Sequence, residues 1–439
     1  MMTKRRRAPH DPLEAAIETA LRPGQFIDYR TEWDFVSELG EIRTQIDQLA
    51  STEPERAVRL HESFLAGCYE KADEIDDSNG SFGQLVDTLY TGWLKARQAA
   101  GADPDQTASL LRDRMENDPY SFTYQIEREA VKILHKSGLA ALERAVRRRF
   151  EAADSSEQAR RGWGEILRVI YAHQRNVGAY VALCEQTALS SRDCLTLAAM
   201  HKARRKPEDA LAWVERGLLL AKERPSESMA GHDLAKLKRE LLAKLGRSSE
   251  ALEAAWAEFQ ESTNTYSYEE LMRFVPKAER ASWHTKAIDA AERGNLGSLI
   301  ELLMETKETE RLIRCLQEAS DSALEGLSHY VTEPAAKRLA KIQPEVAGKV
   351  FRALGMRILN AKKSNYYDAA LAHFEETKSC FERAGIGQQW DAVVAEVRQA
   401  HHRKTGFMPG FERLVAGRGP SQEPSFLERA RNRWLPRGS

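Results

Sequence analysis

Three amphipathic segments follow one another between Lys206 and Gln260, and they constrain the fold more than any other feature of the chain. Gly246 ends the second segment, and only Arg247 and Ser248 precede the third. Connections this short require neighbouring helices to pack antiparallel. Each segment repeats apolar side chains at helical spacing, and the three stripes are Ala210, Leu211, Val214, Leu218 and Ala221; Leu234, Leu237, Leu241, Leu242 and Leu245; and Ala251, Leu252, Ala255, Trp256 and Phe259.

The same stretch contains a repeat. The motif Glu250-Ala251-Leu252 follows Asp209-Ala210-Leu211 after 41 residues, the difference between the two positions of alanine. A small residue followed by a large one, with a glycine in the preceding turn, resembles the helical hairpin of tetratricopeptide repeats. Because alternating β-branched runs are absent, the sequence predicts an all-α fold. We expect an α-α superhelix, or solenoid, of tetratricopeptide-like hairpins with about 18 to 22 helices.

Length and charge indicate an extended rather than a compact architecture. A chain of 439 residues exceeds one compact core, and its 30% charged residues indicate a large wetted surface. Residues 1–10 carry a charge of +4, and residues 403–439 carry +5. Since the whole chain has a net charge of −1, the 392 residues between them carry −10. An acidic body with basic ends disfavours a nucleic-acid groove.

Cysteine usage and hydropathy predict a cytoplasmic protein. The five cysteines are odd in number and scattered, which is typical of reduced thiols rather than a secreted disulfide framework. No run of 18 apolar residues offers a membrane span. Prolines and acidic residues follow Lys4–Arg7 where a signal peptide would need an apolar core.

We expect four regions along the chain: a disordered basic N-terminus (1–23), an N-terminal helical region (24–152), a tetratricopeptide-like region with a C-terminal cap (153–416), and a flexible tail (417–439). Thr31 matches a helix-capping pattern, and Pro334 and Pro344 are each expected to begin a helix. In the cap, Phe407 and Phe411 are expected to cover the last hairpin, with residues 401–404 facing water. Core anchoring is the expected role for most of six tryptophans that fall on or beside apolar stripes, namely Trp33, Trp93, Trp163, Trp213, Trp256 and Trp283.

The acidic loop, Asp73–Ser81, is the most distinctive local feature. A calcium loop with Gly80 as its glycine would place Ile75 and Val86 at the first and last ligand positions, so that pattern fails. One interpretation is a solvated loop whose Asp and Asn side chains cap the next helix. The other is a partner-binding or weak cation site, and its residues would be Asp73, Glu74, Asp76 and Asp77.

Catalytic and metal-binding motifs do not fit the sequence. His61-Glu62 begins like a zinc-protease motif, but Leu65 occupies the second ligand position. Cys184, Cys194 and His201 match no zinc module and are expected to be packed side chains. No phosphate loop or nucleophile elbow is present. We therefore expect no enzyme, no metal and no cofactor, unless catalytic residues meet only in three dimensions.

A basic triplet, Arg147, Arg148 and Arg149, raises the alternative of a nucleic-acid-associated accessory protein. The triplet lies in an expected helix beside Glu143 and Glu151, where a charge run is usually a solvated face. Exposed aromatic residues for base stacking are not interleaved with it. The triplet is kept as a second possible contact for a partner.

Two stretches of the chain resemble sequences of a bacterial family of unknown function. The first runs from Phe64 to Ser78 and on to Gly83, and the second is His401–Phe411. The second is also similar to the C-terminal segment of bacterial SWIM zinc-finger proteins, but the Cys-x-Cys and Cys-x-His ligands of that finger are missing, so zinc is not implied. The resemblance spans most of residues 24–416 and implies a cytoplasmic bacterial helical-repeat protein without assigned activity.

These observations favour a non-catalytic scaffold for protein–protein interaction. Stacked hairpins form grooves that suit a peptide or a helix. The expected partner is a protein or peptide, and the acidic loop is the best local contact. Neither a membrane nor a nucleic acid is the expected partner.

Overall fold

The computed structural model describes residues 11–153, 156–223 and 228–417. The chain divides into two compact units, Met1–Leu241 and Leu242–Ser439. The described residues form 23 α-helices and no β-strand. The all-α helical-repeat fold is confirmed, with slightly more helices than expected. Within the described ranges, no helix combines the length and apolarity that a membrane span requires.

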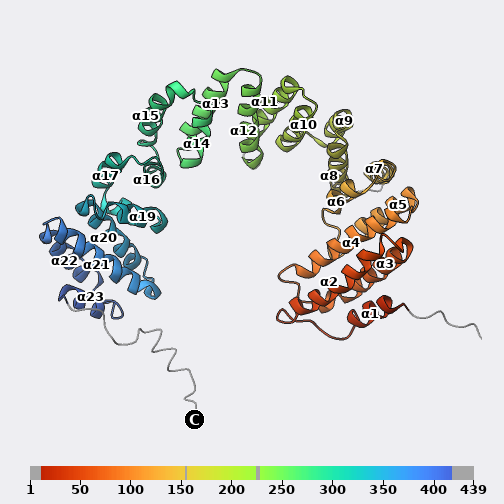
Figure 1. Ribbon diagram of the computed structural model, residues 1–439, viewed down its shortest axis with the longest axis horizontal. Coiled ribbons are helices and arrows are strands. Elements are labelled where there is room, and N and C mark those ends of the chain that lie inside the picture. Colours follow the sequence, from red (N-terminus) through yellow and green to blue (C-terminus); the bar gives the residue numbers. More distant parts are fainter. Residues whose placement is uncertain (1–10, 154–155, 224–227, 418–439) are drawn as a thin grey trace, which may run out of the picture. The chain divides into compact units, whose positions relative to one another are not determined.

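The first unit is a series of helices that pack on their neighbours in sequence. Contacts join α2 to α3, α3 to α4, α7 to α8, α8 to α9, and α10 to α11 (Figure 1). Pro54, Pro104 and Pro207 each occupy a first helical position, where the missing N–H costs no hydrogen bond. The helices are α1 (Pro12–Ala20), α2 (Glu32–Leu49), α3 (Pro54–Lys71), α4 (Ser81–Ala99), α5 (Pro104–Glu116), α6 (Ile126–Ile133), α7 (Lys136–Phe150), α8 (Glu157–Gln174), α9 (Val177–Thr187), α10 (Ser191–Ala203), α11 (Pro207–Glu223) and α12 (Ser228–Lys244), which runs into the second unit.

The second unit continues the same pattern. Contacts join α13 to α14, α16 to α17, α19 to α20, α20 to α21, and α21 to α22. Short 3₁₀ turns cover Ala72–Glu74 in the first unit and Lys277–Glu279 and Ser364–Tyr366 in the second. The helices are α13 (Ser248–Glu261), α14 (Thr265–Phe274), α15 (Arg280–Ala291), α16 (Leu296–Glu305), α17 (Thr309–Glu318), α18 (Asp321–Gly326), α19 (His329–Leu339), α20 (Pro344–Asn360), α21 (Tyr367–Arg383), α22 (Gly387–His401) and α23 (Met408–Val415).

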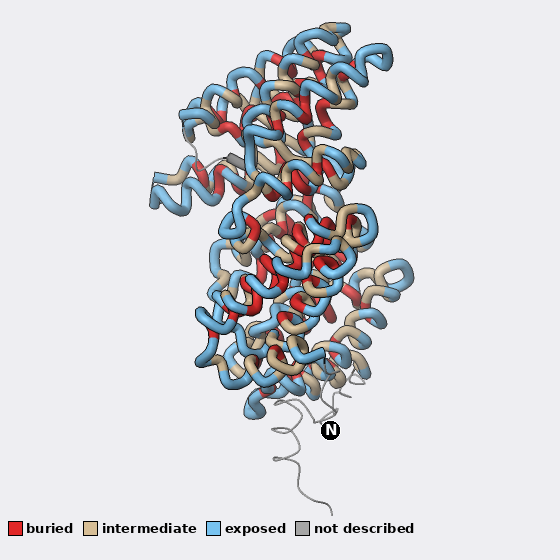
Figure 2. The backbone as a smooth tube through the Cα atoms, turned by 90° about the vertical axis from the view of Figure 1, so that its left-hand side faces the viewer, coloured by how far each residue is buried: buried red, intermediate tan, exposed pale blue. Residues whose placement is uncertain are grey.

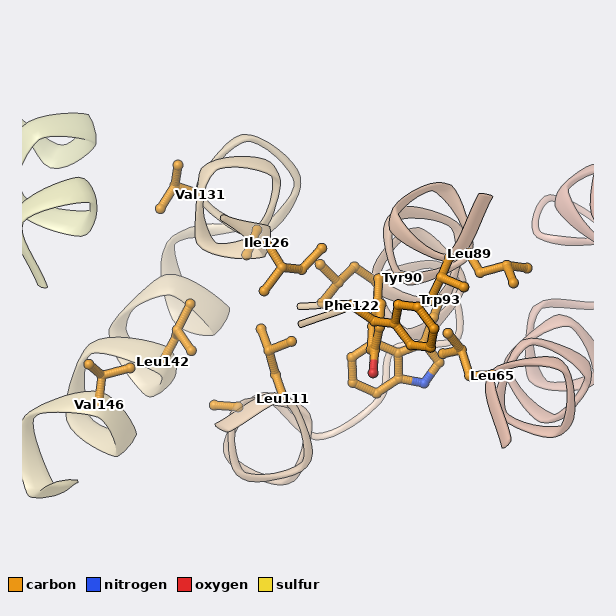
Figure 3. Packing of buried hydrophobic residues seen from close by; sticks show 14 of the residues in the cluster. Leu65, Leu89, Tyr90, Trp93, Leu111, Phe122, Ile126, Val131, Leu142 and Val146 are labelled. Carbon is orange, nitrogen blue, oxygen red and sulfur yellow. The ribbon is translucent and has the colours of Figure 1, made fainter. Parts of the chain in front are cut away.

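Buried residues recur along the helices and are coloured red on the tube in Figure 2. In the first unit one cluster extends from Ile17 to Met200 and contains Tyr90, Trp93 and Phe122 (Figure 3). The second unit has two clusters, one from Ala255 to Cys380 and one from Met356 to Phe411. The boundary expected between residues 152 and 153 lies inside the first unit, where the first cluster continues across it.

The three helices expected between residues 206 and 260 are α11, α12 and α13. Gly246 has a φ of +76°, a left-handed conformation that glycine adopts without a steric penalty. The amide of Arg247 then donates to the carbonyl of Leu242 at 2.9 Å, which closes the end of α12. The expected faces are buried through Ala210, Leu211, Val214, Leu234, Leu241, Ala251 and Phe259.

Three expectations near the N-terminus need correction. Residues 11–21 are not disordered, because Asp11 caps α1 and Ile17 and Leu21 are buried in the core. Residues 1–10 lie outside the described part of the chain. Thr31 makes no side-chain cap, and its own amide donates to Asp28 instead. Trp33 is not a core anchor, since 70% of its surface is exposed.

The C-terminal part of the second unit differs in two details. Pro334 lies inside α19 rather than at its start, whereas Pro344 begins α20 as expected. Phe407 and Phe411 are fully buried, which confirms the expected cap. His401, expected to face water, is instead buried along with the other buried residues of α22. Residues 418–439, including most of the expected tail, lie outside the described residues.

Candidate functional site

The acidic loop is held against a segment of chain about 50 residues earlier. The amide of Ile27 donates to the carbonyl of Glu74 at 2.8 Å, and the amide of Asp76 donates to the carbonyl of Ile27 at 2.9 Å. These two bonds form an isolated parallel bridge between Ile27 and Ile75. Both side chains are buried. The loop and residues 24–34 therefore form one local surface of the first unit.

A buried lysine fixes the base of this surface. The ammonium of Lys71, which is 1% exposed, donates to the carboxylate of Glu74 at 2.6 Å and to the carbonyl of Arg22 at 3.2 Å. Glu74 also accepts from the amide of Gly24 at 2.8 Å. The hydrogen bond from Lys71 lowers the pKa of Glu74 below its usual range.

A buried glutamate fixes the other end. Glu32, the first residue of α2, is fully buried and accepts hydrogen bonds from Asn79 at 2.6 Å and from the hydroxyl of Ser81. Because the side chain of Glu32 points inward, the side chain of Trp33, the next residue of the helix, points to solvent. The loop is thus held at both ends by carboxylates that already accept hydrogen bonds from it or from the neighbouring segment.

The four predicted acidic residues have different partners. Asp77 accepts from the amides of Phe82 and Gly83, both at 2.9 Å, and so caps α4. Asp76 accepts from the amide of Ser78, and Asp73 forms a hydrogen bond with Tyr120 that raises the pKa of that tyrosine. The capping interpretation is confirmed. Among the described residues no three His, Cys, Asp or Glu side chains converge as a metal would require.

Three large aromatic side chains stand out from this surface. Phe26, Tyr29 and Trp33 are 62%, 59% and 70% exposed. They occur within a stretch of eight residues that also contains the buried Ile27. We call residues 26–33 the aromatic segment. Exposed rings grouped on an anchored piece of backbone are typical of protein-binding surfaces.

Acidic side chains flank the aromatic segment. Asp28 accepts from the amides of Arg30 and Thr31, at 2.9 and 3.1 Å, and these bonds lower the pKa of Asp28. Asp34 and Asp73 are exposed. Arg30 of the segment is exposed as well, and the surface as a whole holds more acidic than basic side chains.

The basic triplet on α7 is engaged by acidic or polar neighbours. Arg147 pairs with Glu143 at 3.4 Å and with Glu151 at 3.7 Å. Arg149 pairs with Glu116 of α5. Arg148 donates to the carbonyl of Arg144. The structure does not bring the triplet to the acidic loop as one contact surface.

Four of the five cysteines are buried, and Cys315 is partly buried. None of the five cysteines, all within the described residues, forms a disulfide. Burial raises the pKa of the Cys184 thiol to about 12 and that of Cys315 to about 11. Such thiols carry little thiolate at neutral pH. His201 lies 3.4 Å from Asp209 rather than beside a second ligand.

The sequence pattern does not reveal Lys71, Glu32 or the aromatic segment as parts of one surface. Their partners are 46 to 50 residues away, and no local periodicity marks such pairings. One signal was present: Lys71 and Glu74 fall within the first stretch that resembles the bacterial family.

A family model matches residues 15–409, under the description of DUF6880, a family of unknown function. The chain belongs to this family. The match covers both units of the DUF6880 chain and includes the acidic loop and the aromatic segment. The expected membership in a family without assigned activity is thereby confirmed, whereas the similarity to SWIM zinc-finger proteins is not shown.

No curated protein matches the DUF6880 chain. Among solved structures, one described as "Structure of Naa15/Naa10 bound to HypK-THB" is 14% identical, with a TM-score of 0.33, over 89% of this chain and 64% of that one. The DUF6880 chain thus spans less than two thirds of that structure's length. A circular tandem repeat protein is 12% identical, with a TM-score of 0.20, over 92% of this chain and 95% of that one. Likeness at these TM-scores carries no argument about function.

Proposed function

We propose that this DUF6880 protein is a non-catalytic cytoplasmic scaffold whose aromatic segment docks a protein partner. The observation that carries the proposal is the grouping of Phe26, Tyr29 and Trp33 as exposed rings on an anchored surface. Aromatic residues of this kind supply most of the binding energy in many interfaces. The peptide groove expected from the repeat pattern stays a prediction.

The anchoring supports this role because it lowers the entropic cost of association. A segment already fixed by the Ile27–Ile75 bridge and by Glu32 loses little freedom when a partner binds. Two exposed carboxylates, Asp34 and Asp73, lie on the same surface. The complementary partner therefore carries apolar side chains together with lysine or arginine.

The nucleic-acid alternative receives less support. Arg147 and Arg149 are neutralised by glutamates within the first unit. Phosphate binding depends on arginines and lysines that are available to replace counterions.

Site-specific photo-cross-linking in the native host tests the proposal. The photoreactive residue p-benzoylphenylalanine is placed at Trp33 and, as a matched control, at Tyr366 of the second unit, which is 58% exposed. We expect a reproducible cross-link to one protein from position 33 and none to that protein from position 366. Cross-links of equal yield from both positions, or none from position 33, would contradict the proposal.

A further inference from the structure

A pocket of about 500 Å³ opens between α3, α4 and α5 in the first unit. Leu65 and Tyr69 of α3, Tyr90 of α4, and Leu110 and Arg114 of α5 contribute to its walls. Its size lies in the range of small-ligand sites. Figure 3 shows Tyr90 and its neighbour Trp93 with Leu65 on one side.

The guanidinium of Arg114 is the unusual group in this pocket. It lies over the Trp93 ring, 4.4 Å from its centroid, and 5.5 Å from the centroid of Tyr90. Its Nη1 atom is buried without a hydrogen-bond partner. Within the described residues, no carboxylate lies in ion-pair range of Arg114. Stacking therefore fixes the plane of the guanidinium and leaves its Nη1 group without an acceptor.

Most neighbouring acidic groups already have partners. Glu62 accepts from the indole of Trp93 at 3.0 Å and from Arg97 at 3.4 Å. Asp113 pairs with Arg112. The remaining carboxylate of the lining, Glu70, is an exposed side chain. The pocket thus contains one stacked cation whose hydrogen-bonding capacity is unfilled.

The tyrosine hydroxyls fix the two aromatic walls. Tyr69 donates to Asp118 at 3.0 Å, and the hydroxyls of Tyr69 and Tyr90 are 2.9 Å apart. Because the single proton of Tyr69 goes to Asp118, Tyr90 donates to Tyr69. Neither hydroxyl proton is then available to a ligand, so recognition of an anion falls to Arg114.

We propose that this pocket binds a carboxylate of a peptide. The planar fork of Arg114 donates parallel hydrogen bonds to the two carboxylate oxygens. An adjoining apolar side chain of the peptide lies against Leu65 and Leu110. A phosphate dianion fits less well, because Glu62, Glu70 and Asp113 repel a second negative charge more strongly. The site is separate from the aromatic segment and does not depend on the proposed function.

The indole N–H signal of Trp93, observed by ¹⁵N NMR of tryptophan-labelled protein, reports on the pocket directly. N-acetyl-leucine supplies a terminal carboxylate, and N-acetyl-aspartic acid N-methylamide supplies a side-chain carboxylate. N-acetyl-leucinamide is the neutral control, and inorganic phosphate tests the dianion. We expect a saturable shift with at least one carboxylate probe and none with the amide. The carboxylate that binds more tightly identifies the source.

Substitutions at two arginines separate recognition from folding. Arg114→Gln is expected to weaken carboxylate binding about ten-fold or more, and Arg114→Lys by less, since lysine keeps the charge but loses the fork. Arg59→Gln removes the same charge at an exposed position of α3 that does not line the pocket, and it is expected to change binding by less than about two-fold. The other tryptophan signals show whether each variant keeps its fold.

Two results would overturn the assignment. One is equal binding of N-acetyl-leucine and its amide, or unchanged binding by a folded Arg114→Gln variant. The other is tighter binding of phosphate than of either carboxylate. Loss of cross-linking at Trp33 would leave this assignment intact, so the two proposals fail separately.

Discussion

The Nε2 atom of the buried His61 lies 3.2 Å from Oδ1 of Asp47, and this pair joins α3 to α2 where both approach Gly92 of α4. A Cβ atom added at Gly92 would lie 2.5 Å from Cε1 of His61 and 2.6 Å from Oδ1 of Asp47. These distances are shorter than van der Waals contact. Three helices can approach this closely only because position 92 has no side chain.

Gly92→Ala is therefore expected to destabilise the protein by about 1–3 kcal/mol, the usual cost of overpacking a core. Gly40→Ala in α2 is the matched control, because its added Cβ meets nothing within 4 Å. That control is expected to stabilise by up to about 1 kcal/mol through helix propensity. Urea unfolding measures both, and a neutral or stabilising Gly92→Ala would contradict the packing described.

Trp33 and Trp93 provide a second contrast. Trp33 is exposed and Trp93 is fully buried. We expect Trp33→Ala to change the free energy of unfolding by less than about 0.5 kcal/mol. Trp93→Ala should cost about 3–5 kcal/mol, because it leaves a large cavity and removes the ring beneath Arg114. Thermal unfolding of the two variants measures the difference, and similar losses would place Trp33 in the core after all.

The capping role of the acidic loop leads to a third prediction. Asp77→Ala removes the acceptor for two amides at the start of α4 and should cost about 1 kcal/mol. Asp73→Ala, at an exposed position of the same loop, is expected to cost less than about 0.5 kcal/mol. Added calcium should leave the melting temperature unchanged, because the loop carboxylates have different partners. A calcium-dependent rise that Asp77→Ala abolishes would favour a cation site.

The ion pair that anchors α1 predicts a pH dependence. Arg56 donates to Asp11 at 2.7 Å, and this bond lowers the pKa of Asp11 from 3.8 to about 2. The folded protein thus binds fewer protons at Asp11 than the unfolded chain between these values. The pair stabilises the fold above about pH 4, and this contribution is lost as the pH falls toward 2.

Asp11→Asn keeps a capping side chain and removes the charge. We expect it to destabilise by about 1 kcal/mol at pH 7, since both groups are partly exposed. The difference from the wild type should shrink between pH 4 and pH 2. Urea unfolding across a pH series measures this, and a difference that stays constant to pH 2 would rule out the ion pair as its cause.

The sequence was sufficient for the fold class because helical periodicity is a local property. The stripes at Ala210, Leu234 and Ala251 identify three helices, and Gly246 identifies the turn between two of them. The expectation that Pro334 begins a helix is wrong. Proline is common at the first position of a helix, but α19 begins five residues earlier and contains Pro334 in its interior.

The candidate surface could be predicted only in part. The acidic loop stands out by composition, but its attachment to Ile27 and Glu32 depends on tertiary contacts that no local pattern encodes. Trp33 lies beside an apolar stripe and was expected in the core. Adjacent residues of a helix point in different directions, so Trp33 is exposed because Glu32 occupies the buried position.

The measurement that tests the proposed function most directly is the affinity of the cross-linked partner for a Phe26→Ala, Tyr29→Ala, Trp33→Ala triple variant. Isothermal titration calorimetry with purified proteins gives the dissociation constants, and the melting temperature of the variant shows that its fold is kept. We predict that the dissociation constant rises about ten-fold or more, as expected when central aromatic residues are lost. An affinity equal to that of the wild-type protein would contradict the role of the aromatic segment.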